Sequence, residues 1–173
     1  MIAIESNILV YAHRSDSAWN AIAYRRLGEL IASGFRWGIP WHCLNEFYAI
    51  ATNPKIYKPA STIAEAIRQI EIWLASPTLT ILGEDGDTWP ILRDLIASAK
   101  IIDGGVHDAR IAAVCLQHGV AELWTTDRDF LKFPALRVRN PLIEQPTRVG
   151  EHRANYSPRS RSARGRPIPA KHR

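Results

Sequence analysis

The sequence predicts an α/β fold in which a mostly parallel sheet is covered by helices on both faces. Short apolar segments alternate along the chain with longer segments whose apolar residues recur at helical spacing. Short, continuously apolar strands are typical of parallel sheets buried on both faces, and helices typically form the connections between such strands. With 173 residues, the chain is long enough for one domain with a substantial core.

The expected elements follow one another in a regular order. Strands are predicted at residues 2–4, 37–39, 78–82, 122–125 and 136–138. Helices are predicted at residues 7–12, 17–33, 40–52, 62–74, 89–98 and 107–118, with a turn and a short helix within 127–133. The prolines of residues 53–61 predict a loop between the third and fourth helices.

Capping residues support several of these helix boundaries. Asn7 and Ser17 are suited to the N-cap position, and Pro40 is suited to the first turn of a helix. Gly34 and Gly119 are suited to end helices, because glycine readily adopts the left-handed conformation. The clearest amphipathic helix follows Thr62, and its apolar stripe consists of Ile63, Ala66, Ile67, Ile70 and Leu74.

Charge divides the chain into a body and a tail. Residues 1–145 carry 14 Lys or Arg against 16 Asp or Glu, whereas residues 146–173 carry 8 Lys or Arg against one acid. We therefore predict one domain over residues 1–142 and a basic tail over residues 143–173. The tail is rich in Arg, Ser and Pro and poor in apolar residues, which predicts disorder.

The composition argues against several classes of protein. No apolar run approaches the roughly 18–20 residues that span a bilayer, and the N-terminus lacks the features of a secretory signal. The two cysteines, Cys43 and Cys115, lie outside any CxxC motif, so we expect no disulfide framework and a reducing cytoplasm. No glycine-rich nucleotide-binding motif occurs.

Glu5 is the first candidate site residue. It stands between the apolar residues 2–4 and a second apolar run at residues 8–12. A carboxylate between two buried segments is costly unless another group pairs with it or coordinates it. Ligands collect at the carboxyl ends of strands in open α/β sheets, so this position favours a functional site. A structural hydrogen-bonding role is the simpler alternative.

Four further acids occupy comparable positions. Asp127 and Asp129 follow a later strand, Asp108 stands where a helix begins, and Glu46 lies in a helix that is apolar on two sides, so we expect it to be partly buried. Each acid also has a simpler explanation. Asp108 could be a helix N-cap, Asp127 and Asp129 could be turn residues, and Glu46 could pair with Arg110.

Convergence of these acids would require a cation. Carboxylates that lie together raise one another's pKa values unless a positive charge is present. Oxygen ligands with open positions suit Mg²⁺ or Mn²⁺, and such an ion can activate water and stabilise the charge that develops on a phosphodiester. The residues therefore favour a divalent metal site with Glu5 among its ligands.

Four motifs give the chain a resemblance to a known family. They are Ile4-Glu5-Ser6-Asn7 after a strand, NEF with Glu46, HDARIAA with Asp108, and TTDRDF with Asp127. In this order, over residues 2–142, they resemble the PIN-domain ribonucleases, and among these the VapC toxins of bacterial toxin–antitoxin pairs. The resemblance implies a PIN-like three-layer α/β/α fold, a Mg²⁺- or Mn²⁺-dependent endoribonuclease that cuts RNA such as tRNA, a small antitoxin partner and a homodimer.

The resemblance also implies roles for particular residues. Glu5 and Asp108 would be the chief metal ligands, and Glu46 and Asp127 would complete the acidic pocket. The supporting residues would be Asp129, which holds Asp127, and Asn7 and Thr126, which hold ligands or substrate phosphate unless they serve only as cap and turn residues.

Position 5 departs from the family pattern, which normally has Asp followed by Thr where this chain has Glu5 and Ser6. Glutamate keeps the charge but adds a methylene, and Mg²⁺ requires near-octahedral ligand positions. Two functions therefore remain open. The chain is either a metal-dependent endoribonuclease toxin or a catalytically impaired PIN scaffold that binds RNA or antitoxin without cleavage. The basic tail either adds non-specific RNA affinity or is a solvated extension.

Overall fold

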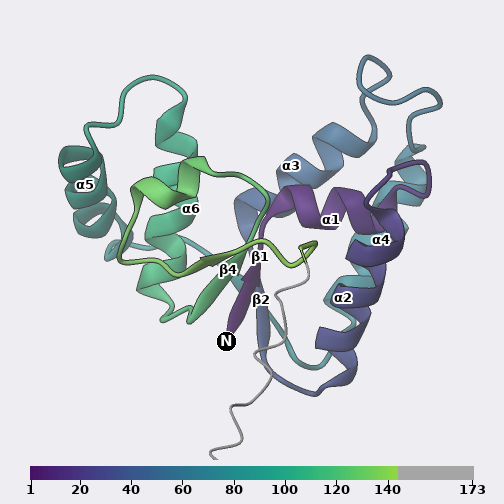
Figure 1. The fold of residues 1–173 in the computed structure, drawn as a ribbon, viewed down its shortest axis with the longest axis horizontal. Coiled ribbons are helices and arrows are strands. Elements are labelled where there is room, and N and C mark those ends of the chain that lie inside the picture. The colour runs from purple at the N-terminus through teal and green to yellow at the C-terminus, as the bar shows by residue number, and fades with distance from the viewer. Residues whose placement is uncertain (144–173) are drawn as a thin grey trace, which may run out of the picture.

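The structure is a computed structural model that describes residues 1–143 (Figure 1). Five strands form one sheet in the order β3-β2-β1-β4-β5, and every pairing between neighbouring strands is parallel. The strands are β1 (Ile2–Ile4), β2 (Trp37–Pro40), β3 (Leu79–Leu82), β4 (Glu122–Trp124) and β5 (Val138–Arg139). The predicted α/β fold with a mostly parallel sheet is confirmed. The predicted basic tail, residues 143–173, lies outside the described residues except for Ile143.

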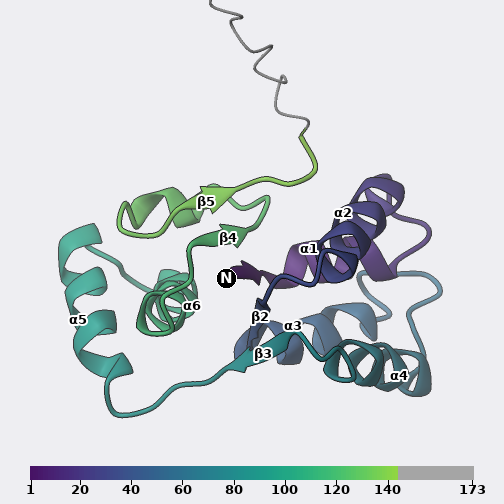
Figure 2. The same cartoon turned by 90° about the horizontal axis from the view of Figure 1, so that it is seen from below.

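Helices cover both faces of this sheet, as the view along it shows (Figure 2). Helices α1 to α4 lie on one side, and α5 and α6 lie on the other, which gives three layers. The helices are α1 (Ser6–His13), α2 (Asn20–Ala32), α3 (Trp41–Ala51), α4 (Ile63–Leu74), α5 (Thr88–Ala99), α6 (Gly105–Gln117) and the 3₁₀ helix η1 (Asp129–Lys132).

The predicted helix ends are largely correct. Thr62 forms a capping box with Glu65, and Gly34 and Gly119 adopt φ values of 72° and 61° after α2 and α6. Helix α2 begins at Asn20, three residues after the predicted cap, because the Ser17 hydroxyl instead accepts a hydrogen bond from the Trp19 N–H in the preceding turn.

The cap of α1 was predicted wrongly. Glu5, rather than Asn7, is the N-cap residue, and its carboxylate accepts a hydrogen bond from the backbone N–H of Asn7. Asn7 lies inside the helix, where its side chain is free to reach the end of a neighbouring strand.

Helix α4 buries only part of its apolar stripe. Trp73 is buried against Phe47 of α3, with ring centroids 4.7 Å apart, and Ala66 is buried with it. Much of the stripe faces solvent: the exposed fractions are 65% for Ile63, 44% for Ile67 and 47% for Leu74. An aromatic contact thus determines how this helix is rotated, and an apolar face remains uncovered by the described chain.

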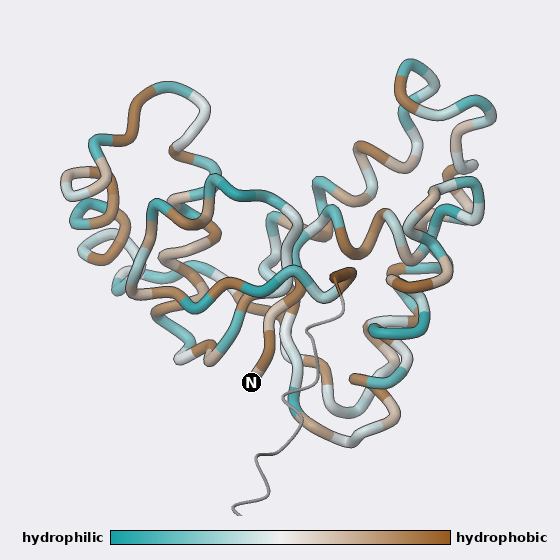
Figure 3. Tube along the Cα trace, viewed as in Figure 1, coloured by the Kyte–Doolittle hydropathy of each residue, from teal (hydrophilic) through white to brown (hydrophobic). Residues whose placement is uncertain are grey.

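The strand order indicates which part of the sheet is suited to bind a ligand, namely the carboxyl end of β1. β1 lies between β2 and β4, so connections leave it in both directions, and such a switch point is where open α/β sheets bind ligands. Ile4 pairs with Trp124, and the N–H of Glu5 donates to the carbonyl of Trp124 at 3.1 Å. The residues that follow β1 and β4 are therefore neighbours, and the few residues directly after β4 are hydrophilic (Figure 3).

Within residues 1–143, no helix is both long enough and apolar enough to cross a membrane.

Candidate active site

Glu5 lies at the buried end of β1 with hydrogen bonds to both carboxylate oxygens. Its exposed fraction is 5%. The Ser6 hydroxyl donates to Oε1, whereas the Asn7 backbone N–H and the Thr125 hydroxyl donate to Oε2 at 3.2 and 3.1 Å. Burial raises the pKa of Glu5, the charge of Glu46 raises it further, and these hydrogen bonds oppose the increase. The structural role considered for Glu5 is therefore present.

Ser6 joins Glu5 to Glu46 of α3. Its hydroxyl oxygen lies 2.7 Å from Oε2 of Glu46 and within hydrogen-bonding distance of Oε1 of Glu5. A hydroxyl has one proton and can donate to only one carboxylate at a time. The carboxylates of Glu5 and Glu46 thus share the single hydroxyl proton of Ser6. A cation bound nearby would stabilise this pair of negative charges.

The partial burial expected for Glu46 and the alternative that it pairs with Arg110 are both wrong. Glu46 is exposed rather than partly buried, although its Oε2 contacts the buried Ser6. Arg110 does not pair with it: the Arg110 guanidinium donates through two nitrogens to Glu84, with Nη2 2.7 Å from Oε2. The charge of Glu46 instead raises the pKa of Glu5 and the pKa of Asp108.

Asp108, Asp127 and Asp129 form an open group of acids beside this buried part. One carboxylate oxygen of each lies within 4.8 Å of the others. Burial raises the pKa of Asp108, and the charges of Asp127, Asp129 and Glu46 raise it further, whereas Lys132 lowers it. Three mutually close oxygen donors with only partial neutralisation fit a hard divalent cation such as Mg²⁺ or Mn²⁺.

The simpler explanations for these aspartates are only partly correct. Gly104, not Asp108, is the N-cap of α6, and Asp108 lies in the first helical turn. Asp127 does act as a turn residue, because its Oδ1 accepts the N–H of Asp129 at 2.8 Å. That turn also brings Asp129, expected only to support Asp127, into the open group itself.

Thr125 connects the two parts of the site and was not identified from the sequence. Its hydroxyl donates to Glu5 and accepts hydrogen bonds from Nδ2 of Asn7 and the N–H of Asp127, both at 2.9 Å. Thr126, the predicted supporting residue, contributes its backbone N–H to Oδ1 of Asn7 at 3.3 Å. Strand register could have indicated Thr125, because it follows β4 as Glu5 follows β1.

The acids therefore form a buried part after β1 and an open part after β4. Glu5 and Glu46 meet through Ser6, the charge of Glu46 acts on Asp108, and Asp108 lies with Asp127 and Asp129. The elements that supply them are β1, α3, α6 and the segment around η1.

Residues 2–136 match the PIN domain family. A VapC ribonuclease of Mycobacterium bovis is 31% identical over 146 residues, which covers 84% of this chain and 98% of the relative. The chain is a PIN-domain protein of the VapC type. Ribonuclease VapC48 of Mycobacterium tuberculosis is 27% identical over 135 residues, covering 78% of this chain and 93% of the relative.

Solved structures share the fold of this PIN domain. VapBC2 from Rickettsia felis, bound to a DNA fragment from its promoter, superposes with a TM-score of 0.59 at 21% identity, covering 81% of this chain and 98% of the other. FitAcB from Neisseria gonorrhoeae superposes with a TM-score of 0.60 at 21% identity, covering 82% and 98%. The predicted PIN-like three-layer α/β/α fold is confirmed.

The hydrogen bonds of Glu5 show what a glutamate does at the position where PIN domains usually have aspartate. The longer side chain of Glu5 reaches the N–H of Asn7 and the hydroxyls of Ser6 and Thr125. The same carboxylate that borders the acidic site therefore also caps α1.

Proposed function

We propose that this chain is the toxin of a toxin–antitoxin pair and hydrolyses RNA phosphodiester bonds as a Mg²⁺- or Mn²⁺-dependent endoribonuclease. The observation that carries the proposal is the convergence of acids from four segments at the switch point of the sheet. The VapC ribonucleases among its relatives support RNA as the substrate.

The proposed metal ligands lie in both parts of the site. The open group supplies three oxygen donors, and the buried Glu5 retains acceptor capacity, because a carboxylate offers about four lone-pair sites. A bound ion would supply charge neutralisation and an activated water. The proposed ligand set is Glu5, Glu46, Asp108 and Asp127, and the closeness of Asp129 to Asp108 and Asp127 supports adding Asp129 to it.

The protein's own groups would position this chemistry. Glu46 is exposed at the edge of the acidic site, where it can orient the attacking water and accept its proton. Thr125 and Asn7 hold the backbone around Asp127, so the open group keeps its geometry through hydrogen bonds to buried residues.

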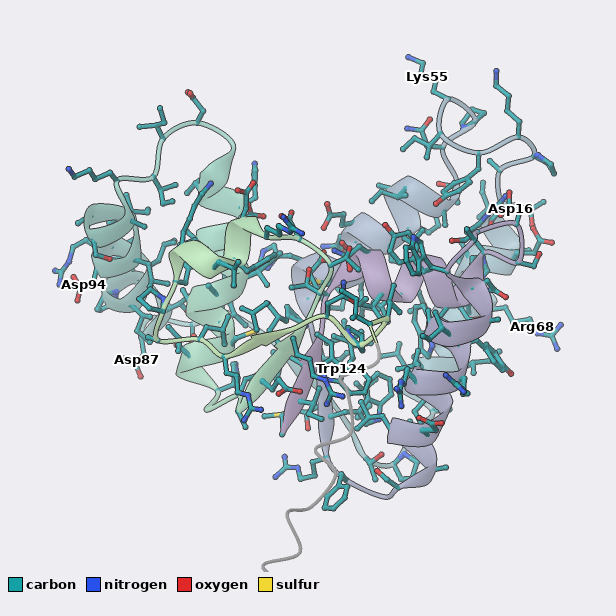
Figure 4. The ribbon with its side chains drawn as sticks, in the orientation of Figure 1. Asp16, Lys55, Arg68, Asp87, Asp94 and Trp124 are labelled. Atoms are coloured by element: carbon teal, nitrogen blue, oxygen red, sulfur yellow. The ribbon has the colours of Figure 1, made fainter. Side chains whose placement is uncertain are left out.

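Metal-dependent cleavage tests the proposal. The purified full chain is incubated with total RNA in Mn²⁺, in Mg²⁺ or in chelator, beside Asp108→Asn and the matched control Asp94→Asn. Asp94 lies on the outer side of α5, away from the site (Figure 4). We expect cleavage that requires metal and is lost only in Asp108→Asn. RNA binding without cleavage in any metal would instead support the catalytically impaired scaffold.

An exposed apolar groove between α2 and α4 is proposed as the antitoxin site. The groove has a volume of about 180 Å³, and two of its residues are largely exposed, Tyr24 at 71% and Ile72 at 58%. The structural neighbours include a toxin–antitoxin complex from Klebsiella pneumoniae, which supports a small protein partner. Ile72→Asp should prevent co-purification with the protein encoded by a small neighbouring reading frame, whereas Ile56→Asp on the distant α3–α4 loop should not.

The uncovered stripe of α4 is proposed as part of a homodimer interface. Leu74 and Ile70 line a groove of about 300 Å³ against Trp41 and Tyr48 of α3, and the stripe continues along α4. A second copy of the chain would bury these apolar side chains, which a monomer leaves in water. Light scattering should show that Leu74→Asp is a monomer while the unmodified chain is a dimer.

A further inference from the structure

A hollow of about 350 Å³ lies beside the acidic site and is lined by residues of α3 and α6. Its volume falls within the roughly 300–1,000 Å³ typical of small-ligand pockets. Glu46 forms part of its wall and also contacts Ser6 of the acidic site, so the hollow adjoins the proposed place of cleavage. The other lining residues include His42, Asn45 and Ala49 of α3 and His107 and Arg110 of α6.

The charges around this hollow disfavour a phosphate group. The guanidinium of Arg110 is already engaged through two nitrogens by Glu84, and Glu46 adds a negative charge to the wall. Burial lowers the pKa of His42, the nearby Arg110 lowers it further and Glu84 opposes the shift, so positive charge on this imidazole is disfavoured. An uncharged ligand therefore fits the hollow better than an anion.

The lining groups are instead those that recognise unpaired nucleobases. Bases stack on histidine rings and on the plane of arginine guanidinium groups, and Glu84 holds the plane of Arg110 in place. The amide of Asn45 can both donate to and accept from a base edge. Nδ1 of His42 is buried and has no hydrogen-bond partner among the described residues.

We propose that this hollow receives an unpaired nucleobase of the RNA next to the phosphodiester that is cut, and thereby determines which base flanks the cleavage point. The inference rests on the proposed ribonuclease function and deepens it. Stacking and edge contacts select the base, while the acids beyond Glu46 act on the backbone.

Filling the hollow tests the inference by binding rather than by catalysis. Ala49→Phe and His107→Ala are made in an Asp108→Asn background, so that the RNA oligonucleotide stays intact while its affinity is measured by fluorescence anisotropy. The matched control is Ala97→Phe, because Ala97 is, like Ala49, an exposed alanine within a helix, but lies in α5 outside the hollow.

We expect both pocket variants to weaken binding by about 5- to 150-fold, the range that removal of one base-stacking contact produces. The control should stay within about twofold of the parent. Scanning the oligonucleotide with abasic positions should reveal one position at which Ala49→Phe causes no further loss, because the base that it excludes is already missing.

Binding by Ala49→Phe that equals binding by Ala97→Phe would overturn the inference, as would additive losses at every abasic position. The result is separable from the proposed function. If the unmodified chain cleaves RNA and Ala49→Phe keeps its pattern of cut sites, only the base pocket is wrong. If binding depends on the hollow but no metal supports cleavage, only the nuclease proposal is wrong.

Discussion

The buried and open parts of the acidic site differ in how their charges are satisfied. In the buried part, Glu5 receives hydrogen bonds from Ser6, Asn7 and Thr125 and also caps a helix. In the open part, Asp108, Asp127 and Asp129 lie within 4.8 Å of one another, and Lys132 is the cation that lowers the pKa of Asp108.

This difference separates what the fold needs from what the chemistry needs. Hydrogen bonds that satisfy a buried carboxylate stabilise the folded state, and their loss leaves polar groups without partners. Like charges gathered in the open cost stability and are useful only when something positive binds them. Variants in the buried part should therefore lower both stability and activity, whereas variants in the open part should lower activity without lowering stability.

Removing a charge from the open part should produce the largest effect on activity. Asp108→Asn should reduce metal-dependent RNA cleavage by more than about 100-fold, since even residues that only support metal ligands typically cost 10- to 100-fold. Thermal unfolding should show a melting temperature equal to or above that of the unmodified chain, because the substitution relieves repulsion. A clear loss of stability in this variant would mean that Asp108 belongs with the buried part.

Shortening the buried carboxylate should change the metal preference. Glu5→Asp should raise Mg²⁺-dependent cleavage by up to about 100-fold, because a displacement of about 1 Å at a reacting site carries a penalty of that order. Stability should be retained, because aspartate is a preferred N-cap residue. Initial rates in Mg²⁺ and Mn²⁺ measure this change. Equal rates for both chains would show that Glu5 already presents its ligand oxygen correctly.

Thr125 joins the buried and open parts of the site, so loss of its hydroxyl should lower both activity and stability. Thr125→Val should lower cleavage by about 10- to 100-fold and reduce the free energy of unfolding by about 1–3 kcal/mol, because Glu5, Asn7 and the N–H of Asp127 each lose a partner. The matched control is Thr126→Val, since Thr126 contributes its backbone N–H. Equal losses in the two variants would restore the sequence-based assignment to Thr126.

Metal and pH should act on stability through the raised pKa values of Glu5 and Asp108. The folded state binds these protons more tightly than the unfolded state, so stability should fall as pH rises from the ordinary values of 3.8 for Asp108 and 4.5 for Glu5 through the raised folded values. Above that window, Mn²⁺ at 100 times its dissociation constant should restore about 2.7 kcal/mol. Calorimetry over pH should show a smaller gain from Mn²⁺ in Asp108→Asn.

The sequence predicts the fold well because its signals are local and repeated. Ile2–Ile4 reads as a strand from its own apolar residues, and Thr62 and Gly119 mark helix ends by their own chemistry. The rotation of α4 could not be predicted in this way, because it depends on Trp73 packing against Phe47, which is distant in the chain.

The same distinction holds for the site. The acids could be found one by one, because each stands at the end of a strand or in a conspicuous motif. Their partition into two parts could not, since it depends on the register that brings Thr125 beside Glu5 and on the turn that brings Asp129 beside Asp127. Arg110 shows the same limit, because it pairs with Glu84 and not with Glu46.

The smallest expected effect comes from the cation at the border of the open part. Nζ of Lys132 lies 2.8 Å from Oδ1 of Asp129, its side chain is about half exposed, and surface ion pairs of this kind contribute little to stability. Lys132→Met should therefore leave the melting temperature nearly unchanged. It should nevertheless tighten Mn²⁺ binding a few-fold in calorimetric titration, because the ion no longer competes with a fixed positive charge for the same oxygens. Lys55→Met, on the distant α3–α4 loop (Figure 4), should change neither quantity. If Lys132→Met instead weakened Mn²⁺ binding, Lys132 would be holding Asp129 in its ligand position. The open part would then depend on internal partners just as the buried part does.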